Sequence, residues 1–91
     1  MTKLDTAQIK SRLAALTDWK KTGTTITRTF VFKDFPAAIR FVNAVARLAE
    51  KAWHHPDIDI RWNQVALTLT SHSEGGLTEK DFKLAQQFDR L

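Results

Sequence analysis

With 91 residues, a net charge of +4 and no cysteine, the chain is expected to form one small domain over residues 1–91 without disulfide bonds. No apolar run approaches the roughly 20 residues that span a bilayer, and the N-terminus lacks the apolar core of a secretory signal, so we expect a cytoplasmic protein without membrane contact. The charge is uneven, because residues 1–53 carry 10 Lys and Arg against 4 Asp and Glu (+6), whereas residues 54–91 carry 4 against 6 (−2).

Three segments begin with residues that can cap a helix. Asp5, with Gln8 three positions later, forms a capping-box pattern. Asp34 precedes the longest run of helical apolar periodicity, and Pro36 suits the first turn of that helix because its missing N–H needs no partner there. Thr78 can cap the last helix. The helices are therefore predicted over residues 5–16, 34–54 and 78–91.

The segments between these helices have the composition of strands. The strand before the long helix is rich in β-branched and aromatic side chains. After the long helix, two segments of alternating apolar residues flank Asn63-Gln64, which predicts a tight hairpin turn there. The strands are predicted over residues 19–22, 24–33, 56–62 and 65–71.

This order, α-β-β-α-β-β-α, predicts an α+β fold with a four-stranded antiparallel sheet and three helices packed on one face. Such a sheet has open edges, and a chain of this length buries only a modest share of its surface. Both features favour a homodimer or homotetramer.

All three histidines lie in the second half of the chain, at positions 54, 55 and 72. Pro56 disfavours helical geometry at His55, so the long helix should end near Trp53 or His54. The hairpin then reverses the chain. Because its two strands have matched lengths, His72 is expected to return to a position beside His55.

Three interpretations of these histidines are possible. A zinc site is disfavoured, because the chain has no cysteine and adjacent histidines on an extended backbone point to opposite faces. An acid/base site suits imidazole, which gives and takes protons near neutral pH. The histidines could also be a simple helix-end residue and an idle turn residue. Spacing alone leaves the second and third interpretations open.

A longer pattern around the histidines resembles the pterin-4a-carbinolamine dehydratases, whose animal members also act as dimerisation cofactors of a homeodomain transcription factor. The family pattern is an acidic residue, His-His-Pro, an aromatic residue, a further His and a later Asp at fixed spacing. The matching residues here are Glu50, His54, His55, Pro56, Trp62, His72 and Asp81.

The resemblance implies a lyase that removes water from 4a-hydroxytetrahydropterin and gives quinonoid dihydropterin. Aromatic amino-acid hydroxylases leave their cofactor in this hydroxylated form, so the implied context is a hydroxylase pathway. One proton must reach the departing 4a-hydroxyl and one must leave ring N5, and both are general acid/base steps. No metal or other cofactor is implied, because the pterin is the substrate.

The resemblance also implies a role for each matching residue. The three histidines would line the pterin pocket, with His54 and His72 acting on the departing hydroxyl and His55 nearer N5 or the ring face. Glu50 and Asp81 would orient the imidazoles. The remaining implied contacts are a pocket wall of Pro56 and Trp62 and hydrogen bonds to the pyrimidine ring from Ser71, Ser73 and Glu74.

Two other functions compete with the dehydratase. A non-catalytic oligomeric adaptor or coactivator-type module is supported by the apolar stripe of the long helix and by the basic first half of the chain. Nucleic-acid binding is disfavoured, because the basic residues are scattered and form no Arg-rich run.

Overall fold

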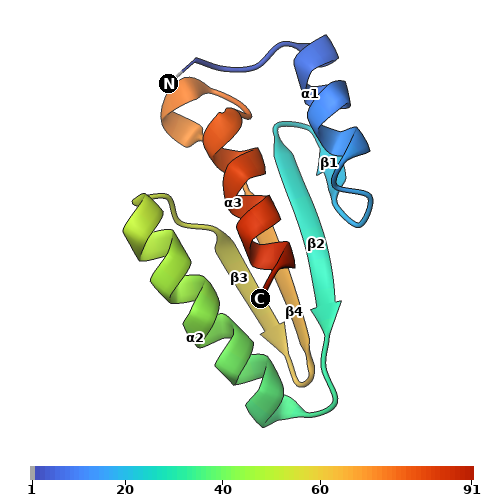
Figure 1. Ribbon diagram of the computed structural model, residues 1–91, viewed down its shortest axis with the longest axis vertical. Helices are drawn as coiled ribbons and strands as arrows, with labels where there is room; N and C mark the ends of the chain where they lie inside the picture. The colour runs from blue at the N-terminus through green and yellow to red at the C-terminus, as the bar shows by residue number, and fades with distance from the viewer. Residues whose placement is uncertain (1) are drawn as a thin grey trace.

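The computed structural model describes residues 2–91, which form four strands, three α-helices and one short 3-10 helix (Figure 1). Their order confirms the expected α-β-β-α-β-β-α arrangement. The elements are α1 (Thr6–Ala14), β1 (Lys20–Thr22), β2 (Thr25–Val31), α2 (Phe35–Ala52), β3 (Asp57–Arg61), β4 (Gln64–Leu69), η1 (His72–Glu74) and α3 (Glu79–Asp89).

The four strands form one sheet in the order β1-β2-β4-β3, and every neighbouring pair is antiparallel. The helices cover one face of this sheet (Figure 1), which confirms the predicted α+β architecture. β3 is therefore an edge strand, and the hairpin that it forms with β4 begins directly after α2. This connection brings the end of α2 and the end of β4 to the same end of the sheet.

The core lies between the helices and the covered face of the sheet. Val65, Leu67 and Leu69 alternate along β4 and are fully buried, because side chains one residue apart point to opposite faces. On β2, Ile26 pairs with Leu69 and Phe30 pairs with Val65. The helices complete the core with the buried residues Ala38, Phe41, Val45, Phe82, Leu84, Ala85 and Phe88.

The capping signals of the sequence are confirmed at the helix starts. Asp5 and Gln8 form a reciprocal capping box at α1. The Asp34 carboxylate accepts a hydrogen bond from the Ala37 amide at 2.9 Å at the start of α2. Each of these side chains satisfies an amide that has no partner within its helix, which is why the helices begin where they do.

The hairpin turn lies one residue earlier than expected. Arg61 pairs with Gln64, so the two-residue loop is Trp62-Asn63 and not Asn63-Gln64. Trp62 adopts a φ of 53°, a left-handed conformation that is unusual for a bulky residue. A tertiary contact sets this register, because the Asn63 side-chain amide donates to the Phe32 carbonyl at 2.9 Å and the Phe32 amide donates to the Asn63 carbonyl at 2.8 Å.

The N-terminal segment contacts the start of α3 through a backbone hydrogen bond and an ion pair. The Leu4 amide donates to the Leu77 carbonyl at 2.8 Å, and the Arg12 guanidinium lies 2.5 Å from the Glu79 carboxylate. The hydrogen bond from Arg12 lowers the pKa of Glu79 below its ordinary value. Both side chains of this ion pair are exposed, so we expect it to guide the packing of α1 more than to stabilise the fold.

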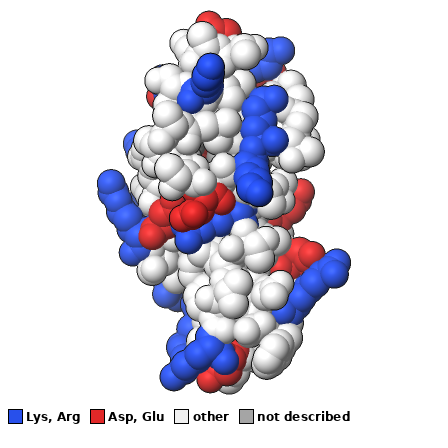
Figure 2. Space-filling model, turned by 90° about the vertical axis from the view of Figure 1, so that its right-hand side faces the viewer, with Lys and Arg blue, Asp and Glu red and all other residues white. Residues whose placement is uncertain are grey.

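Lys and Arg side chains do not gather on the side of the molecule shown in Figure 2. Blue Lys and Arg side chains stand apart in that view, with red acidic side chains and uncharged atoms between them. Arg28, for example, is paired with Asp89 at 2.7 Å. None of the helices in residues 2–91 is both long and apolar enough to cross a membrane.

Candidate active site

The end of α2 turns its two following histidines toward the end of β4. Trp53 caps α2 in a left-handed conformation with φ 53°, and the His54 amide still donates to the Ala49 carbonyl at 3.1 Å. Pro56 follows and prevents a further helical turn. His72 begins η1 just after β4, at the same end of the sheet.

The structure brings all three histidines to one cavity of about 420 Å³. This volume falls within the roughly 300–1,000 Å³ range of small-molecule sites in proteins. The cavity is lined by Trp53, His54, His55, Thr70, Ser71, His72, Ser73, Glu74, Thr78 and Lys80.

The imidazole of His54 is held by the buried carboxylate of Asp81. The distance from His54 Nε2 to Asp81 Oδ1 is 2.5 Å, and Asp81 is fully buried. An ionised carboxylate only accepts hydrogen bonds, so a bond to ionised Asp81 places a proton on His54 Nε2. The other ring nitrogen, Nδ1, is then the one that can exchange a proton with a ligand.

The imidazole of His55 has a carboxylate partner of its own, but in solvent. His55 Nε2 lies 2.8 Å from Glu50 Oε1, and the two side chains are 56% and 68% exposed. The ring also stacks edge-on against Trp53, with the ring centroids 5.5 Å apart. Solvent weakens such a pair, so Glu50 orients His55 less firmly than Asp81 orients His54.

The residues expected to bind the pyrimidine ring differ in exposure, since two are exposed at the cavity and one is buried. Ser73 and Glu74 line it from η1 and are exposed. Ser71 also touches the cavity but is 6% exposed, and its hydroxyl donates to Asp81 Oδ2 at 2.9 Å. The single hydroxyl hydrogen of Ser71 is therefore directed into the protein and not toward a ligand.

Two residues expected in the pocket wall lie elsewhere. Trp62 occupies the tip of the β3–β4 hairpin and is 70% exposed, at the end of the strands opposite η1 (Figure 1). Within the single described chain Trp62 does not line the histidine cavity, because the cavity adjoins the start of β3 and Trp62 follows its end. Pro56 lines a neighbouring apolar hollow together with Glu50 and His55.

Four lining residues were missed by the sequence analysis as members of the site: Trp53, Thr70, Thr78 and Lys80. Thr78 was recognised only as a helix cap. A sequence signal did exist for Thr78 and Lys80, since both lie within three residues of Asp81 at the start of a helix. Trp53 and Thr70 stand next to predicted site residues but match no motif.

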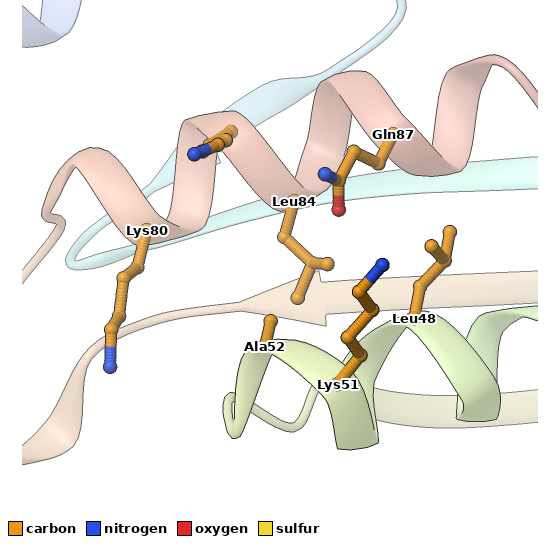
Figure 3. Close-up of a pocket in the computed structure, with 7 residues that line it drawn as sticks. Leu48, Lys51, Ala52, Lys80, Leu84 and Gln87 are labelled. Carbon is orange, nitrogen blue, oxygen red and sulfur yellow. The ribbon is translucent and has the colours of Figure 1, made fainter.

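A second hollow of about 370 Å³ lies between α2 and α3 (Figure 3). It is lined by Leu48, Ala52 and Leu84, and Lys51 extends from α2 into the space between the two helices (Figure 3). The lining residues, all within the described part of the chain, include no histidine and no carboxylate. This hollow therefore offers no group that exchanges protons near neutral pH, and the histidine cavity is the candidate active site.

Within residues 2–91, no three His, Cys, Asp or Glu side chains are arranged to hold a metal ion. The histidine cavity is instead built from two separate imidazole–carboxylate pairs and a third imidazole, His72, on the opposite segment. This arrangement offers proton donors and acceptors on different sides of one small space.

Comparisons with known proteins agree on one family. The model of the family described as pterin 4 alpha carbinolamine dehydratase matches residues 2–91. Proteins that carry a provisional pterin-4-alpha-carbinolamine dehydratase name are similar along their whole length. One from Roseiflexus sp. is 56% identical, over 99% of this chain and 97% of that protein. One from Chloroflexus aurantiacus is 55% identical, over 100% and 98%.

Two solved structures share the fold. A protein from Brucella melitensis, described as a transcriptional coactivator/pterin dehydratase, superposes with a TM-score of 0.94 at 40% identity and covers 98% of this chain and 97% of its own. A pterin dehydratase-like protein, identified as a RuBisCO assembly factor in the alpha-carboxysome, has a TM-score of 0.67 at 23% identity and covers 79% and 83%. The second likeness concerns the fold alone.

Proposed function

The chain belongs to the pterin 4 alpha carbinolamine dehydratase family, and we propose that it removes water from 4a-hydroxytetrahydropterin to give quinonoid dihydropterin. The observation that carries this proposal is that three imidazoles line one cavity. Two of them have a carboxylate partner, since His54 Nε2 is hydrogen-bonded to Asp81 and His55 Nε2 to Glu50. The reaction would regenerate a pterin cofactor after an aromatic amino-acid hydroxylase has used it.

The elimination needs two proton transfers and no change of oxidation state by the protein. The C4a–O bond breaks and the departing hydroxyl takes a proton to leave as water. The N5–H bond breaks, and its electron pair forms the C4a=N5 double bond of the quinonoid product. One proton is gained by the oxygen and one is lost from the nitrogen, so the protein returns to its starting protonation state after proton exchange.

The three histidines are suited to these two transfers. We assign His54 and His72 to the departing hydroxyl, with His54 acting through Nδ1 because its Nε2 is bonded to Asp81. His55, bonded to Glu50 through Nε2, is assigned to the N5 side or the ring face. General acid/base catalysis by a positioned side chain contributes about 10²–10⁴-fold per transfer, which is ample for a reaction that also proceeds slowly in water.

Binding of the pterin ring is assigned to groups on η1. Ser73 and Glu74 are exposed at the cavity, and a side-chain hydroxyl and carboxylate match the amide and amino groups of a pyrimidine edge. Trp53, also exposed and stacked against His55, offers an aromatic edge on the other side of the cavity.

The location of a bound pterin tests this proposal. A crystal soaked with 7,8-dihydropterin, a stable relative of the product, is expected to hold the bicyclic ring within hydrogen-bond distance of His54 and His72. A ring bound only in the hollow between α2 and α3, beside Leu48 and Leu84, would contradict the assignment of the site.

A second candidate function is that of an oligomeric adaptor, which the edge strand β3 favours. Ile58 and Ile60 lie on the helix-covered face but remain 38% and 39% exposed, next to the unpaired edge of the sheet. We propose that another copy of the chain covers this edge. Sedimentation of the purified protein should therefore show a species larger than 10.4 kDa, and a monomer at all concentrations would argue against both self-association and the adaptor.

A further inference from the structure

We propose that Ser71 and Thr78 are positioning residues that hold Asp81 and, through it, fix the proton of His54 on Nε2. This inference rests on the proposed function for its catalytic consequence, but the geometry behind it is independent of the substrate. It explains why two hydroxyl side chains are buried beside a carboxylate at the base of the cavity.

The direction of each hydrogen bond in this group follows from the chemistry of the partners. Asp81 Oδ2 accepts from the Thr78 amide and from the Ser71 hydroxyl, both at 2.9 Å. Ser71 has one hydroxyl hydrogen, which it gives to the carboxylate. The 2.9 Å contact between the Ser71 and Thr78 hydroxyls must then run from Thr78 to Ser71. The order of donation is Thr78 to Ser71 to Asp81.

The burial of these groups makes the arrangement rigid. Thr78 and Asp81 are fully buried and Ser71 is 6% exposed, so water does not replace a missing partner. Ser71 is also paired with Gly76 as an isolated bridge, which closes the loop between β4 and α3. The two oxygens of Asp81 therefore have different partners. Oδ2 accepts from the Ser71 hydroxyl and the Thr78 amide, and Oδ1 is left for His54.

A carboxylate held in this way dictates the state of the imidazole. Rotation of Asp81 would break its two bonds at Oδ2, so Oδ1 stays directed at His54 Nε2. The proton on Nε2 then lies between the ring and a buried carboxylate, and Nδ1 is the ring nitrogen left for a ligand. The exposed pair of His55 and Glu50 lacks such support and serves as an internal reference.

Exchange of the imidazole N–H protons, followed by NMR, tests the inference without any substrate. In the wild type, the Nε2–H of His54 should exchange with water at least about tenfold more slowly than that of His55, since buried hydrogen-bonded groups open less often. Ser71→Ala should remove most of this difference. A wild-type His54 proton that exchanges as fast as that of His55, or one unaffected by Ser71→Ala, overturns the inference.

A second pair of variants covers the case in which Ser71→Ala does not fold. Thr78→Val keeps the shape of the side chain and removes its hydroxyl, whereas Thr78→Ser keeps the hydroxyl. Faster exchange of the His54 proton in Thr78→Val, with rescue in Thr78→Ser, supports the inference. Equal exchange in the two variants contradicts it. Thr27→Val is the matched control, because it removes one hydroxyl of the Thr27–Thr68 contact on the open face of the sheet.

The catalytic consequence is measured separately. Ser71→Ala should lower kcat for dehydration about tenfold with little change in KM, because the ring nitrogens are present but less well oriented. A Ser71→Ala protein whose His54 Nε2 proton exchanges faster, but whose kcat is unchanged, would reject the effect on catalysis and leave the positioning of His54 standing. A wild type with protected His54 but no dehydration would instead reject the proposed function and leave the positioning intact.

Discussion

Replacement of His54 by alanine is expected to lower kcat for dehydration by about 10²-fold or more, the lower end of the usual contribution of a general acid or base. His54 is the imidazole with the most firmly fixed orientation, because its Nε2 is bonded to a fully buried carboxylate. Stopped-flow measurement of the decay of 4a-hydroxytetrahydropterin under saturating conditions gives kcat directly.

Two further variants make this result specific. His55→Ala should reduce kcat less than His54→Ala, since His55 and its partner Glu50 are mostly exposed. Lys83→Gln changes the separate hollow between α2 and α3 and should leave kcat unchanged. A His54→Ala protein that keeps wild-type kcat would show that this imidazole does not take part in the chemistry.

Replacement of Asp81 by alanine is expected to lower the free energy of unfolding by about 2–4 kcal/mol and to reduce kcat as well. The loss of the carboxylate leaves the Thr78 amide and the His54 ring without an acceptor, whereas the Ser71 hydroxyl can turn to Thr78 Oγ1, 2.9 Å away. Each unsatisfied buried polar group costs about 1–3 kcal/mol, and relaxation of the site recovers part of the sum. Urea unfolding monitored by tryptophan fluorescence measures the change.

Asp59→Ala is the matched control for Asp81→Ala. Asp59 lies on the edge strand β3, where its side chain is 58% exposed and lies 3.2 Å from the Arg61 guanidinium. Its removal should change the unfolding free energy by less than about 0.5 kcal/mol, as is usual for surface substitutions. An Asp81→Ala protein as stable as Asp59→Ala would mean that the buried hydrogen bonds contribute little.

The parts of the fold that local chemistry determines were predictable from the sequence. Asp5 and Asp34 mark helix starts because a capping carboxylate accepts from amides within its own first turn, and at the start of α3 the Thr78 amide donates to the Asp81 carboxylate. Pro56 marks the end of α2 for an equally local reason. The hairpin turn was misplaced because the contact between Asn63 and Phe32, 31 residues apart, forces Trp62 into a conformation that no local rule favours.

The candidate site was predictable to the extent that strand geometry governs it. Matched strand lengths in the hairpin place His72 near the end of α2. Ser71 was expected to face the substrate, yet it continues the period-two pattern of Leu67 and Leu69, which is the buried face of β4. The same alternation predicts that the Ser71 side chain points into the protein. The spacing of a motif does not tell at which end of the hairpin a residue lies, so it could not place Trp62 at the hairpin tip.

The dehydration rate itself tests the central claim most directly. The decay of 4a-hydroxytetrahydropterin, followed by stopped flow, should accelerate in proportion to the concentration of wild-type protein. The acceleration should fall by at least about 10²-fold when both His54 and His72 are replaced by alanine. A decay equal to the spontaneous rate in buffer, or one that the double replacement leaves unchanged, would contradict catalysis at the histidine cavity.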